Sequence, residues 1–479
     1  MNTSSQPRRV VVVGGGIAGL STAYYLQRAA ARQRLELAIT IVERSERLGG
    51  KLLTERLDAL DGDGTFVIEG GPDAFITQKP WGVQLAHELG LGDQLISTND
   101  ARHKVYVLHR GKPIPLPDGV TLVVPTMLMP FLRSPLISWP GKLRMALDLV
   151  IPARRGDQDE ALAAFIKRRL GSEALDKIAE PLMAGIYNSE SDRLSLLSTF
   201  PRFRAVEEKF GSLIRGMRSS RQQARQAPGQ PTSPFVSLRG GVATLIDALA
   251  GQIDATILPG RTVTALERAA GADGYVVALD DGARLEAAAV VLAAPAYAAA
   301  DLLAPLDGDL AGRLRQIRYV STGTVSLAYR RADIGGDPLE TYGVVIPHSE
   351  GRQINACTIS SRKFAHRAPG DYVLIRAFVG GSRNPHALRL DDAGLVEMVR
   401  NEFQLILGIT AEPVLSRVYR WDQANPQYDV GHLERVAELE AACPPGLYLT
   451  GSPYRGVGIP DCIHQAQQTA AQVVERLQG

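Results

Sequence analysis

The stretch Val10-Val-Val-Val-Gly-Gly-Gly-Ile-Ala-Gly19 decides the fold of this 479-residue chain. Four β-branched residues in a row are typical of a strand that is buried on both faces of a parallel sheet. The glycines that follow have the spacing G-x-G-x-x-G, and residues 20–28 have a helical pattern. Strand, glycine turn and helix in this order predict a unit that binds a dinucleotide.

Each glycine of the turn has a separate physical role in this prediction. Gly14 permits the tight turn, Gly16 lets a pyrophosphate approach the backbone, and Gly19 lets the helix pack close to the strand. The helix N-terminus then offers free N–H groups and a partial positive charge to the phosphates.

The next strand and the segment after it indicate which dinucleotide is bound. The predicted strand 37–42 ends in Glu43, whose carboxylate accepts hydrogen bonds from a ribose diol. Then comes Arg44-Ser-Glu-Arg-Leu-Gly-Gly-Lys51, a basic and glycine-rich segment that adds phosphate contacts. It resembles the E-R-x-x-R-x-G-G motif of the FAD-containing amine-oxidase-like superfamily, which NAD dehydrogenases lack. The expected cofactor is therefore FAD.

A second glycine-rich helix start lies near the other end of the chain. Gly446-Leu-Tyr-Leu-Thr-Gly451 reads as a strand, and Gly456-Val-Gly-Ile-Pro-Asp461 leads into a helix through residue 474. Pro460 suits the first turn of a helix, where its missing N–H is not needed. The N–H groups of such a start stabilise the negative charge of a reduced flavin ring, although the same pattern is also typical of a plain helix cap.

The segments between these ends predict an α/β fold with two inserts. A hairpin is expected over 275–292, and Val263 lies on the strand before it. In FAD proteins of this class such strands return to the nucleotide domain. The expected FAD-binding domain is therefore discontinuous, over 1–80, 236–295 and 415–479. Residues 81–235 predict a largely helical insert, and 296–414 a mixed α/β substrate domain.

Composition limits the remaining function classes. The net charge of +2 is too balanced for a nucleic-acid coat. The three cysteines Cys357, Cys443 and Cys462 have no metal or disulfide spacing, which predicts a reducing compartment and no metal. No secretory signal and no run of 18 apolar residues is found, so we expect a cytoplasmic protein without a spanning helix.

One apolar stretch has more than one interpretation. Residues 121–139 read TLVVPTMLMPFLRSPLISW and are punctuated by proline. They could dock on a membrane peripherally, guide an apolar substrate, or pack in the core. Core packing is preferred because no basic amphipathic face accompanies them.

Six further segments, in order, resemble one family over nearly the whole chain, the bacterial oxygen-dependent coproporphyrinogen and protoporphyrinogen oxidases. Their sequences are Glu69-Gly-Gly-Pro-Asp73, Glu180-Pro-Leu-Met-Ala-Gly-Ile-Tyr187, Leu194-Ser-Leu-Leu-Ser-Thr-Phe-Pro201, Glu208-Lys-Phe-Gly-Ser-Leu-Ile-Arg-Gly-Met217, Pro426-Gln-Tyr-Asp-Val-Gly-His432 and Gly456-Val-Gly-Ile-Pro-Asp-Cys462. Those in the inserts are the specific ones. The resemblance implies a Rossmann-like FAD domain of the glutathione-reductase type and a porphyrinogen substrate.

The resemblance also implies site residues. The expected FAD contacts are Gly14, Gly15, Gly16, Ile17, Ala18, Gly19, Glu43, Arg44, Lys51, Gly70, Gly71, Pro72, Asp73, Val263, Trp421, Val457, Gly458 and Ile459. Gly185 is expected to line the substrate pocket. Ser189 stands where the family usually has a glycine, which leaves the local backbone geometry open.

The implied reaction removes six electrons from a porphyrinogen in three rounds, each of which reduces one O₂ to H₂O₂, within haem biosynthesis. The flavin performs the chemistry, so no nucleophile or metal is required. Lys79 is a candidate anchor for a substrate carboxylate, unless it is a plain surface lysine. Asp73 could orient pyrrole N–H groups or cap a turn, and no general base is identified. Handover to a downstream haem-pathway enzyme is a further expectation.

Coproporphyrinogen III is the preferred substrate, and protoporphyrinogen IX is the second candidate. Three further functions stay open on the sequence alone. They are an FAD amine oxidase or desaturase, an NAD dehydrogenase, and a flavin-binding haem-pathway partner without turnover.

Overall fold

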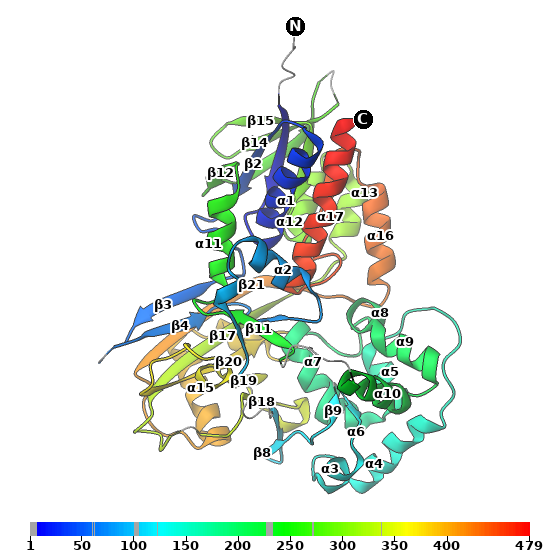
Figure 1. Cartoon of the computed structure of the whole chain (residues 1–479), viewed down its shortest axis with the longest axis vertical. Coiled ribbons are helices and arrows are strands. Elements are labelled where there is room, and N and C mark those ends of the chain that lie inside the picture. The colour runs from blue at the N-terminus through cyan, green and yellow to red at the C-terminus, as the bar shows by residue number, and fades with distance from the viewer. Residues whose placement is uncertain are drawn as a thin grey trace.

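The computed structural model describes residues 7–59, 61, 63–99, 105–121, 123–226, 233–270, 273–336 and 338–479. One part of the molecule, drawn in the upper half of Figure 1, is built on a five-stranded sheet in which every neighbouring pair is parallel. Its strands, in spatial order, are β12 (Thr256–Pro259), β2 (Leu37–Glu43), β1 (Arg8–Val13), β16 (Ala289–Leu292) and β22 (Leu447–Leu449). The predicted strands at 10–13, 37–42 and 446–451 are confirmed.

The two faces of this sheet are covered by different layers, as the alternation of side chains along β1 requires. Val10 and Val12 contact three helices, α1 (Ile17–Gln33), α11 (Ala243–Gln252) and α17 (Ile459–Gln478). Val11 and Val13 contact the other layer, whose elements are β13 (Val263–Arg268), β14 (Tyr275–Leu279), β15 (Arg284–Ala287), α12 (Ala296–Leu303), α13 (Gly308–Leu314) and α16 (His432–Ala442). Helices α1 and α17 lie side by side (Figure 1) and share one apolar core.

The second part, at the lower left of Figure 1, is a seven-stranded sheet that helix α15 (Asp392–Leu407) covers. Its strands, in spatial order, are β21 (Leu415–Pro426), β17 (Tyr319–Arg330), β20 (Tyr372–Gly380), β19 (Ala356–Ile359), β18 (Gly343–Val345), β7 (Val105–His109) and β8 (Lys112–Pro115). Two small sheets connect it to the parallel sheet. They contain β3 (Thr54–Asp58) and β4 (Thr65–Glu69), and β5 (Phe75–Ile76), β11 (Phe235–Leu238) and β6 (Leu95–Ser97).

The third part, at the lower right of Figure 1, is a cluster of helices that we call the helical lobe, residues 128–226. Its main helices are α3 (Leu128–Arg133), α4 (Trp139–Ala146), α5 (Leu162–Arg169), α7 (Glu180–Tyr187), α9 (Pro201–Phe210) and α10 (Leu213–Gln226). The largely helical character that the sequence predicts is found in this lobe, whose core includes Phe165, Phe203 and Leu213.

Two segments differ from the sequence-based expectation. Residues 105–115, expected within the helical insert, form strands β7 and β8 of the seven-stranded sheet. Residues 415–426, expected to begin the last part of the FAD-binding domain, form β21, which pairs with β17 in that same sheet. Strand β7 pairs with β18, and β21 pairs with β17, so each joins a partner far away in the chain. Local periodicity carries no information about such partners.

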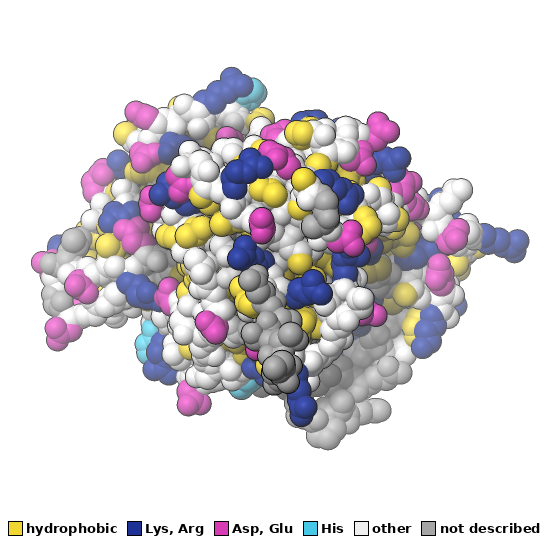
Figure 2. Space-filling view, turned by 90° about the horizontal axis from the view of Figure 1, so that it is seen from above, with side chains coloured by type: hydrophobic (Ala, Val, Ile, Leu, Met, Phe, Trp, Pro, Cys, Tyr) yellow, Lys and Arg dark blue, Asp and Glu magenta, His cyan; other side chains and the backbone are white. Residues whose placement is uncertain are grey.

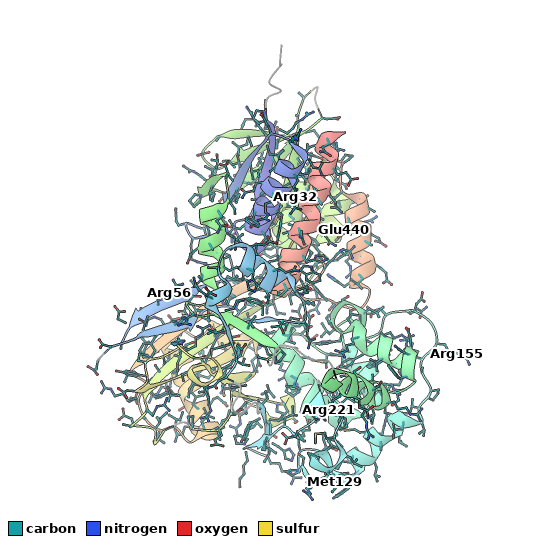
Figure 3. The ribbon with its side chains drawn as sticks, viewed as in Figure 1. Arg32, Arg56, Met129, Arg155, Arg221 and Glu440 are labelled. Carbon is teal, nitrogen blue, oxygen red and sulfur yellow. The ribbon has the colours of Figure 1, made fainter. Side chains whose placement is uncertain are left out.

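The apolar stretch 121–139 is divided between core and surface. Val123, Val124, Phe131, Leu136 and Ile137 are buried, as the preferred interpretation requires. Three large apolar side chains, at positions 128, 129 and 139, are exposed, and Met129 lies at the lower edge of the helical lobe in Figure 3. Core packing therefore accounts for only part of this stretch.

Helix α4 and the 3₁₀ turn after it (Leu147–Leu149) have an inverted polarity. Trp139, Leu143, Leu147 and Val150 recur on one face and are between 49% and 74% exposed. The opposite face turns polar residues inward, where Lys142 donates to the carbonyls of residues 132 and 134, and the carboxylate of Asp148 binds Arg169. An apolar stripe that faces outward marks a surface with a binding role.

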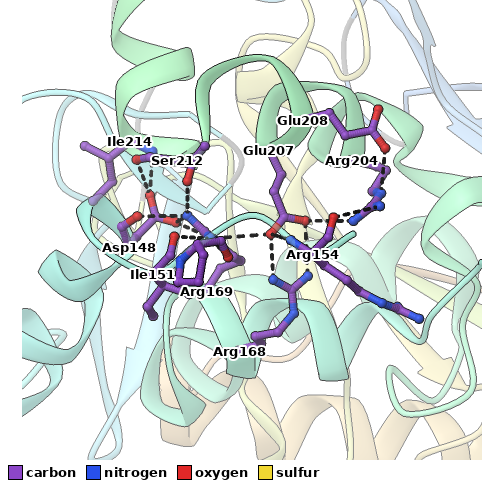
Figure 4. A network of polar contacts seen from close by, with 12 residues as sticks. Asp148, Ile151, Arg154, Arg168, Arg169, Arg204, Glu207, Glu208, Ser212 and Ile214 are labelled. Atoms are coloured by element: carbon purple, nitrogen blue, oxygen red, sulfur yellow. Dashed lines mark hydrogen bonds and ion pairs between the residues drawn. The ribbon is translucent and has the colours of Figure 1, made fainter. Parts of the chain in front are cut away.

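A buried network of charges holds this turn against the lobe (Figure 4). Arg169 and Asp148 are both fully buried, and the Nε of Arg169 donates to Asp148 Oδ1 over 2.6 Å. Glu207, also fully buried, accepts from Arg168 and Arg204. On the opposite side of the molecule, in Figure 2, basic and acidic side chains are interspersed over the surface.

Candidate functional site

A cavity of about 770 Å³ lies where the three parts of the molecule meet. Its wall combines residues from the loop after β4, from α7, from the strands β17 to β21 and from the start of α17. The lining is mostly apolar, with Val105, Leu182, Ile186, Val345, Phe378 and Val379 among its side chains. Such a cavity suits a flat and largely apolar ligand together with a cofactor.

Half of the predicted cofactor contacts line this cavity. They are Lys51, Gly70, Gly71, Pro72, Asp73, Trp421, Val457, Gly458 and Ile459. These residues come from three distant segments of the chain. The residues that the family resemblance implies therefore lie together on one wall of the cavity.

The other predicted contacts lie at the glycine turn, next to this wall. Gly16 pairs with Gly49, and a Cβ at Gly16 would meet nothing nearer than the Cα of Gly50, 4.0 Å away, among the described residues. Gly50 directly precedes Lys51 of the cavity wall. Gly16 thus faces open space at the N-terminus of α1, where a pyrophosphate would bind. Ile17, Ala18 and Gly19 form the first turn of that helix.

Glu43, the last residue of β2, places a carboxylate beside the same glycine turn. The carboxylate of Glu43 accepts the backbone N–H of Gly15 over 2.7 Å and that of Ser45 over 2.8 Å. Arg44 is exposed, and Val263 begins β13 two residues after Arg261, whose N–H donates to the carbonyl of Glu43. The position of Glu43 suits a ribose diol.

The start of α17 meets the start of α1, although the two lie at opposite ends of the chain. A Cβ at Gly451 would lie 3.3 Å from the Cβ of Ala18. The ammonium of Lys51 donates to Ser452 Oγ over 3.1 Å and to the carbonyl of Ala424 over 2.7 Å. Because Lys51 is buried, the pKa of its ammonium lies below the ordinary value. Open space, helix N-termini and a lysine converge here, so the residues present fit an FAD.

Lys79 does not reach the cavity, which corrects its expected role as a substrate anchor. Its ammonium binds both carboxylate oxygens of Asp461, over 2.6 and 2.7 Å, in the first turn of α17. Lys363 lines the cavity, whereas Lys79 is not among the residues that line it. The sequence placed Lys79 near the pocket by its distance from Asp73 along the chain, but β5 intervenes and redirects the backbone.

Two cations that the sequence did not predict as site residues, Lys363 and Arg376, line the cavity. Lys363 binds Asp73 over 2.7 Å, and Arg376 stands beside the same carboxylate from strand β20. Burial alone would raise the pKa of Asp73, but Lys363 and Arg376 outweigh it and hold the pKa below its usual value. Arg376 had a signal, because it is a lone charge in the apolar run of β20. Lys363 had none.

The glycine-to-serine departure at Ser189 has a simple structural outcome. The left-handed backbone falls on Asn188, with φ of 49°, and not on Ser189. Asparagine tolerates this conformation better than most residues, so no glycine is needed at 189. Asn188 lines the cavity. Gly185 lies in α7, and its expected position on the wall of the substrate pocket stays a prediction, because its contacts are not among those that the structure describes.

Glu69, directly before the cavity wall, predicts a measurable pH dependence. Burial raises the pKa of Glu69 to about 7, although Arg367 and hydrogen bonds from Thr54 and Val242 favour the carboxylate. The folded protein therefore keeps a proton that the unfolded chain releases. As pH rises from about 4.5 to 7, this group should lower the free energy of unfolding by about 3 kcal/mol.

Glu69→Gln should remove this dependence. The expected result in denaturant titrations is a wild type that loses stability relative to the variant as pH rises through that window. Glu286→Gln, at an exposed side chain of β15, is the control and should follow the wild type. Parallel pH profiles for wild type and Glu69→Gln would contradict the prediction.

A parallel sheet with a glycine turn, beside a mostly apolar cavity, is typical of dinucleotide-dependent oxidoreductases. The family described as flavin containing amine oxidoreductase matches residues 17–474, and the chain belongs to it. The protein is therefore an FAD-dependent oxidoreductase.

Within that class the relatives are more specific. Coproporphyrinogen III oxidase of Bacillus subtilis (strain 168) is 35% identical over 480 residues, covering 99% of both chains. The enzyme of the same name from Propionibacterium freudenreichii is 38% identical and covers 97% of this chain and 90% of its own. The chain belongs to the coproporphyrinogen III oxidase family. A chloroplastic protoporphyrinogen oxidase of Oryza sativa is 30% identical and covers 98% of this chain and 88% of its own.

Solved structures agree with the fold. An Exiguobacterium sp. 255-15 protein that was assigned as a protoporphyrinogen oxidase has a TM-score of 0.87 at 34% identity, and it covers 99% of this chain and 100% of its own. Putrescine oxidase bound to putrescine has a TM-score of 0.68 at 17% identity, covering 98% of this chain and 99% of its own, and shows the fold alone. The chain thus has the mixed α/β fold of the FAD amine oxidases.

Proposed function

We propose that this protein oxidises coproporphyrinogen III to coproporphyrin III, with three O₂ reduced to three H₂O₂. The single observation that carries the proposal is the cavity itself. It adjoins the segment that follows the glycine turn, it is mostly apolar, and it carries Lys363 and Arg376 on its wall. An apolar macrocycle with acidic side chains requires this combination of properties. The protein's relatives of that name support the same substrate.

We assign the parts of the fold accordingly. The discontinuous segments 1–80, 236–295 and 415–479 form a Rossmann-like FAD-binding domain of the glutathione-reductase type, without the strand β21 that belongs to the seven-stranded sheet. Residues 81–235 and 296–414 supply the helical and mixed α/β walls of the substrate site. The resemblance, the parallel sheet and the contact between the starts of α1 and α17 support this division.

The chain's own residues would hold and orient the two ligands. We propose the glycines of the turn and Lys51 for the phosphates, Glu43 for the ribose, and Val457, Gly458 and Ile459 for the ring. When bound, FAD supplies the redox chemistry by accepting electrons from the substrate and passing them to O₂. The apolar wall keeps the macrocycle dry, and Asp73 lies near enough to that wall to orient pyrrole N–H groups.

Porphyrin fluorescence tests this function directly. Purified holoenzyme should convert coproporphyrinogen III to a fluorescent porphyrin in air but not under argon, with about three H₂O₂ for each porphyrin, as six electrons require. Protoporphyrinogen IX and putrescine are run beside it. A faster rate on protoporphyrinogen IX would favour that substrate instead. In a separate experiment the bound flavin is photoreduced and air is readmitted. If coproporphyrinogen III is then oxidised no faster than it autoxidises without the protein, the result would favour a flavin protein without turnover.

The apolar stripe of α4 supports a peripheral contact with a lipid bilayer, which we also propose. Asp148 is the only acidic residue of 123–156, and its side chain is buried. Arg133 and Arg155 are exposed in the segments that flank α4 in the chain, and the carboxylate of Glu173 binds Ser138 at the start of α4. The apolar stripe suits the interface of a bilayer, and the flanking arginines suit anionic headgroups. Among the described residues, no helix has the length and apolar character needed to traverse a bilayer.

The double variant Leu143→Glu, Val150→Glu tests this contact. We expect it to lower the fraction of protein that floats with phosphatidylglycerol-containing vesicles by about tenfold or more, since two large apolar side chains are lost from the bilayer contact. Leu405→Glu, at a similarly exposed leucine of α15, is the matched control and should bind as the wild type does. A wild type that does not float, or an equal loss in the control, would contradict the contact.

A further inference from the structure

The charges on the cavity wall do not balance. Among the described residues, four side chains with formal charges line it, namely Lys51, Asp73, Lys363 and Arg376. Lys51 is bound by two uncharged acceptors at the glycine-turn end. Lys363 and Arg376, by contrast, share the single carboxylate of Asp73. Two cations around one carboxylate leave an excess positive charge on this part of the wall.

Arg376 shows the imbalance at the level of atoms. Its side chain is 97% buried, given a relative exposure of 3%, yet its Nε has no hydrogen-bond partner among the described residues. The Nη2 atom donates to the backbone carbonyls of Gly70 and Gly71. A buried guanidinium N–H without an acceptor is costly, and a carboxylate is its preferred partner.

Lys363 can move between partners because its surroundings leave it room. It ends helix α14 (Ser360–Lys363), and its side chain and that of Asp73 are 19% and 21% exposed at the cavity. The rings of Phe235 and Phe364 lie 5.9 and 5.2 Å from its ammonium. Asp73 would keep compensation from Arg376 and Arg367 if Lys363 turned to another anion.

The charges behind this wall do not supply the missing anion. Glu69 and Arg367 lie 3.7 Å apart and form their own pair. Burial raises the pKa of Glu69 to about 7, so near neutral pH it carries only part of a negative charge. Asp73 and Glu69 thus face three cations, Lys363, Arg376 and Arg367. The five side chains together have an excess of positive charge on the side that faces the cavity.

We propose that Lys363 and Arg376 form a carboxylate-binding subsite, which Asp73 shares in the resting enzyme and which one acidic side chain of the tetrapyrrole enters. The inference rests on the proposed function, because it takes the ligand to be a porphyrinogen with acidic side chains. It makes Lys363 a specificity residue for carboxylate-bearing macrocycles.

Paired ligands test the subsite without relying on turnover. Coproporphyrin III carries carboxylates and its tetramethyl ester does not, so their Kd values, from porphyrin fluorescence, separate charge from shape. Lys363→Met should raise the Kd of the acid by about tenfold to a hundredfold, the usual loss for a charge-assisted contact. It should change the Kd of the ester less than about twofold. Lys363→Arg should restore binding of the acid.

Two more variants sharpen the test. Asp73→Asn removes the internal competitor and should raise the affinity for the acid relative to that for the ester, because both ligands share any contact of Asp73 with the pyrrole N–H groups. Lys209→Met, at an exposed lysine of α9, is the control and should match the wild type. An equal loss for acid and ester in Lys363→Met, or no loss for either, would overturn the subsite.

The proposed function can fail separately. A wild type that forms no porphyrin from coproporphyrinogen III would overturn that function. A wild type that binds and oxidises it, with Lys363→Met unchanged, would overturn only the subsite.

Discussion

Gly16→Val should yield a folded protein that is purified without flavin. The backbone at Gly16 has φ of −77° and ψ of −179°, an extended conformation that valine adopts readily. A Cβ there meets no described atom nearer than 4.0 Å, so the fold itself tolerates the side chain. The added methyl groups would occupy the space into which the FAD pyrophosphate must fit. We expect the ratio of absorbance at 450 nm to that at 280 nm to fall at least about tenfold, because the pyrophosphate and the valine side chain cannot occupy the same space.

Gly19→Ala is the informative contrast. Its Cβ would lie 1.8 Å from the carbonyl oxygen of Gly14, so the helix could no longer pack against the strand end. This variant should lose thermal stability as well as flavin, whereas Gly16→Val should keep the circular dichroism and the melting temperature of flavin-free wild type. Full flavin content in purified Gly16→Val would refute the assignment of the turn.

Asp148→Ala should have the second large effect, on the stability of the helical lobe. The carboxylate of Asp148 binds Arg169 Nε and Ser212 Oγ, each over 2.6 Å, and the N–H of Ile214 over 2.9 Å. Its removal leaves Arg169 fully buried, with the more distant Glu207 as its remaining counter-charge among the described residues. Breaking a buried pair in this way costs about 3–5 kcal/mol. The expected result is earlier unfolding in urea and faster proteolysis within residues 128–226.

The control for this experiment is Glu208→Ala, which removes an ion pair with Arg204 from a side chain that is 55% exposed. Exposed pairs contribute about 0–1 kcal/mol, so this variant should unfold close to the wild type. Asp148→Asn retains the shape of the side chain and separates charge from packing. A urea midpoint for Asp148→Ala equal to that of the wild type would show that the network does not stabilise the lobe.

The parts of the site that follow from local backbone chemistry were predictable from the sequence. Gly14 to Gly19 were predicted to form a turn because a buried strand precedes them, a helical pattern follows, and the next strand ends in an acid. The helix after Gly458 follows in the same way from Pro460 and the glycines before it. These motifs also located Asp73, since it ends a segment that the family resemblance identifies.

The parts that depend on distant contacts were not predictable. Lys79 is close to Asp73 in the chain but binds Asp461, whereas Lys363 is far from Asp73 in the chain and binds it. The strands β7 and β21 join the seven-stranded sheet through partners that no local pattern names. Such contacts follow from the packing of the whole molecule, which residue spacing does not encode.

The contact between α1 and α17 has a consequence for the order in which the molecule can form. During translation the glycine turn is made before Gly451, Ser452 and the helix that begins at Ile459, and most of the described chain is made between them. Strand β22, the edge of the parallel sheet beside β16, is equally late. The contact between the starts of α1 and α17 can therefore form only after the segment with α17 has been made, however early β1 and α1 fold.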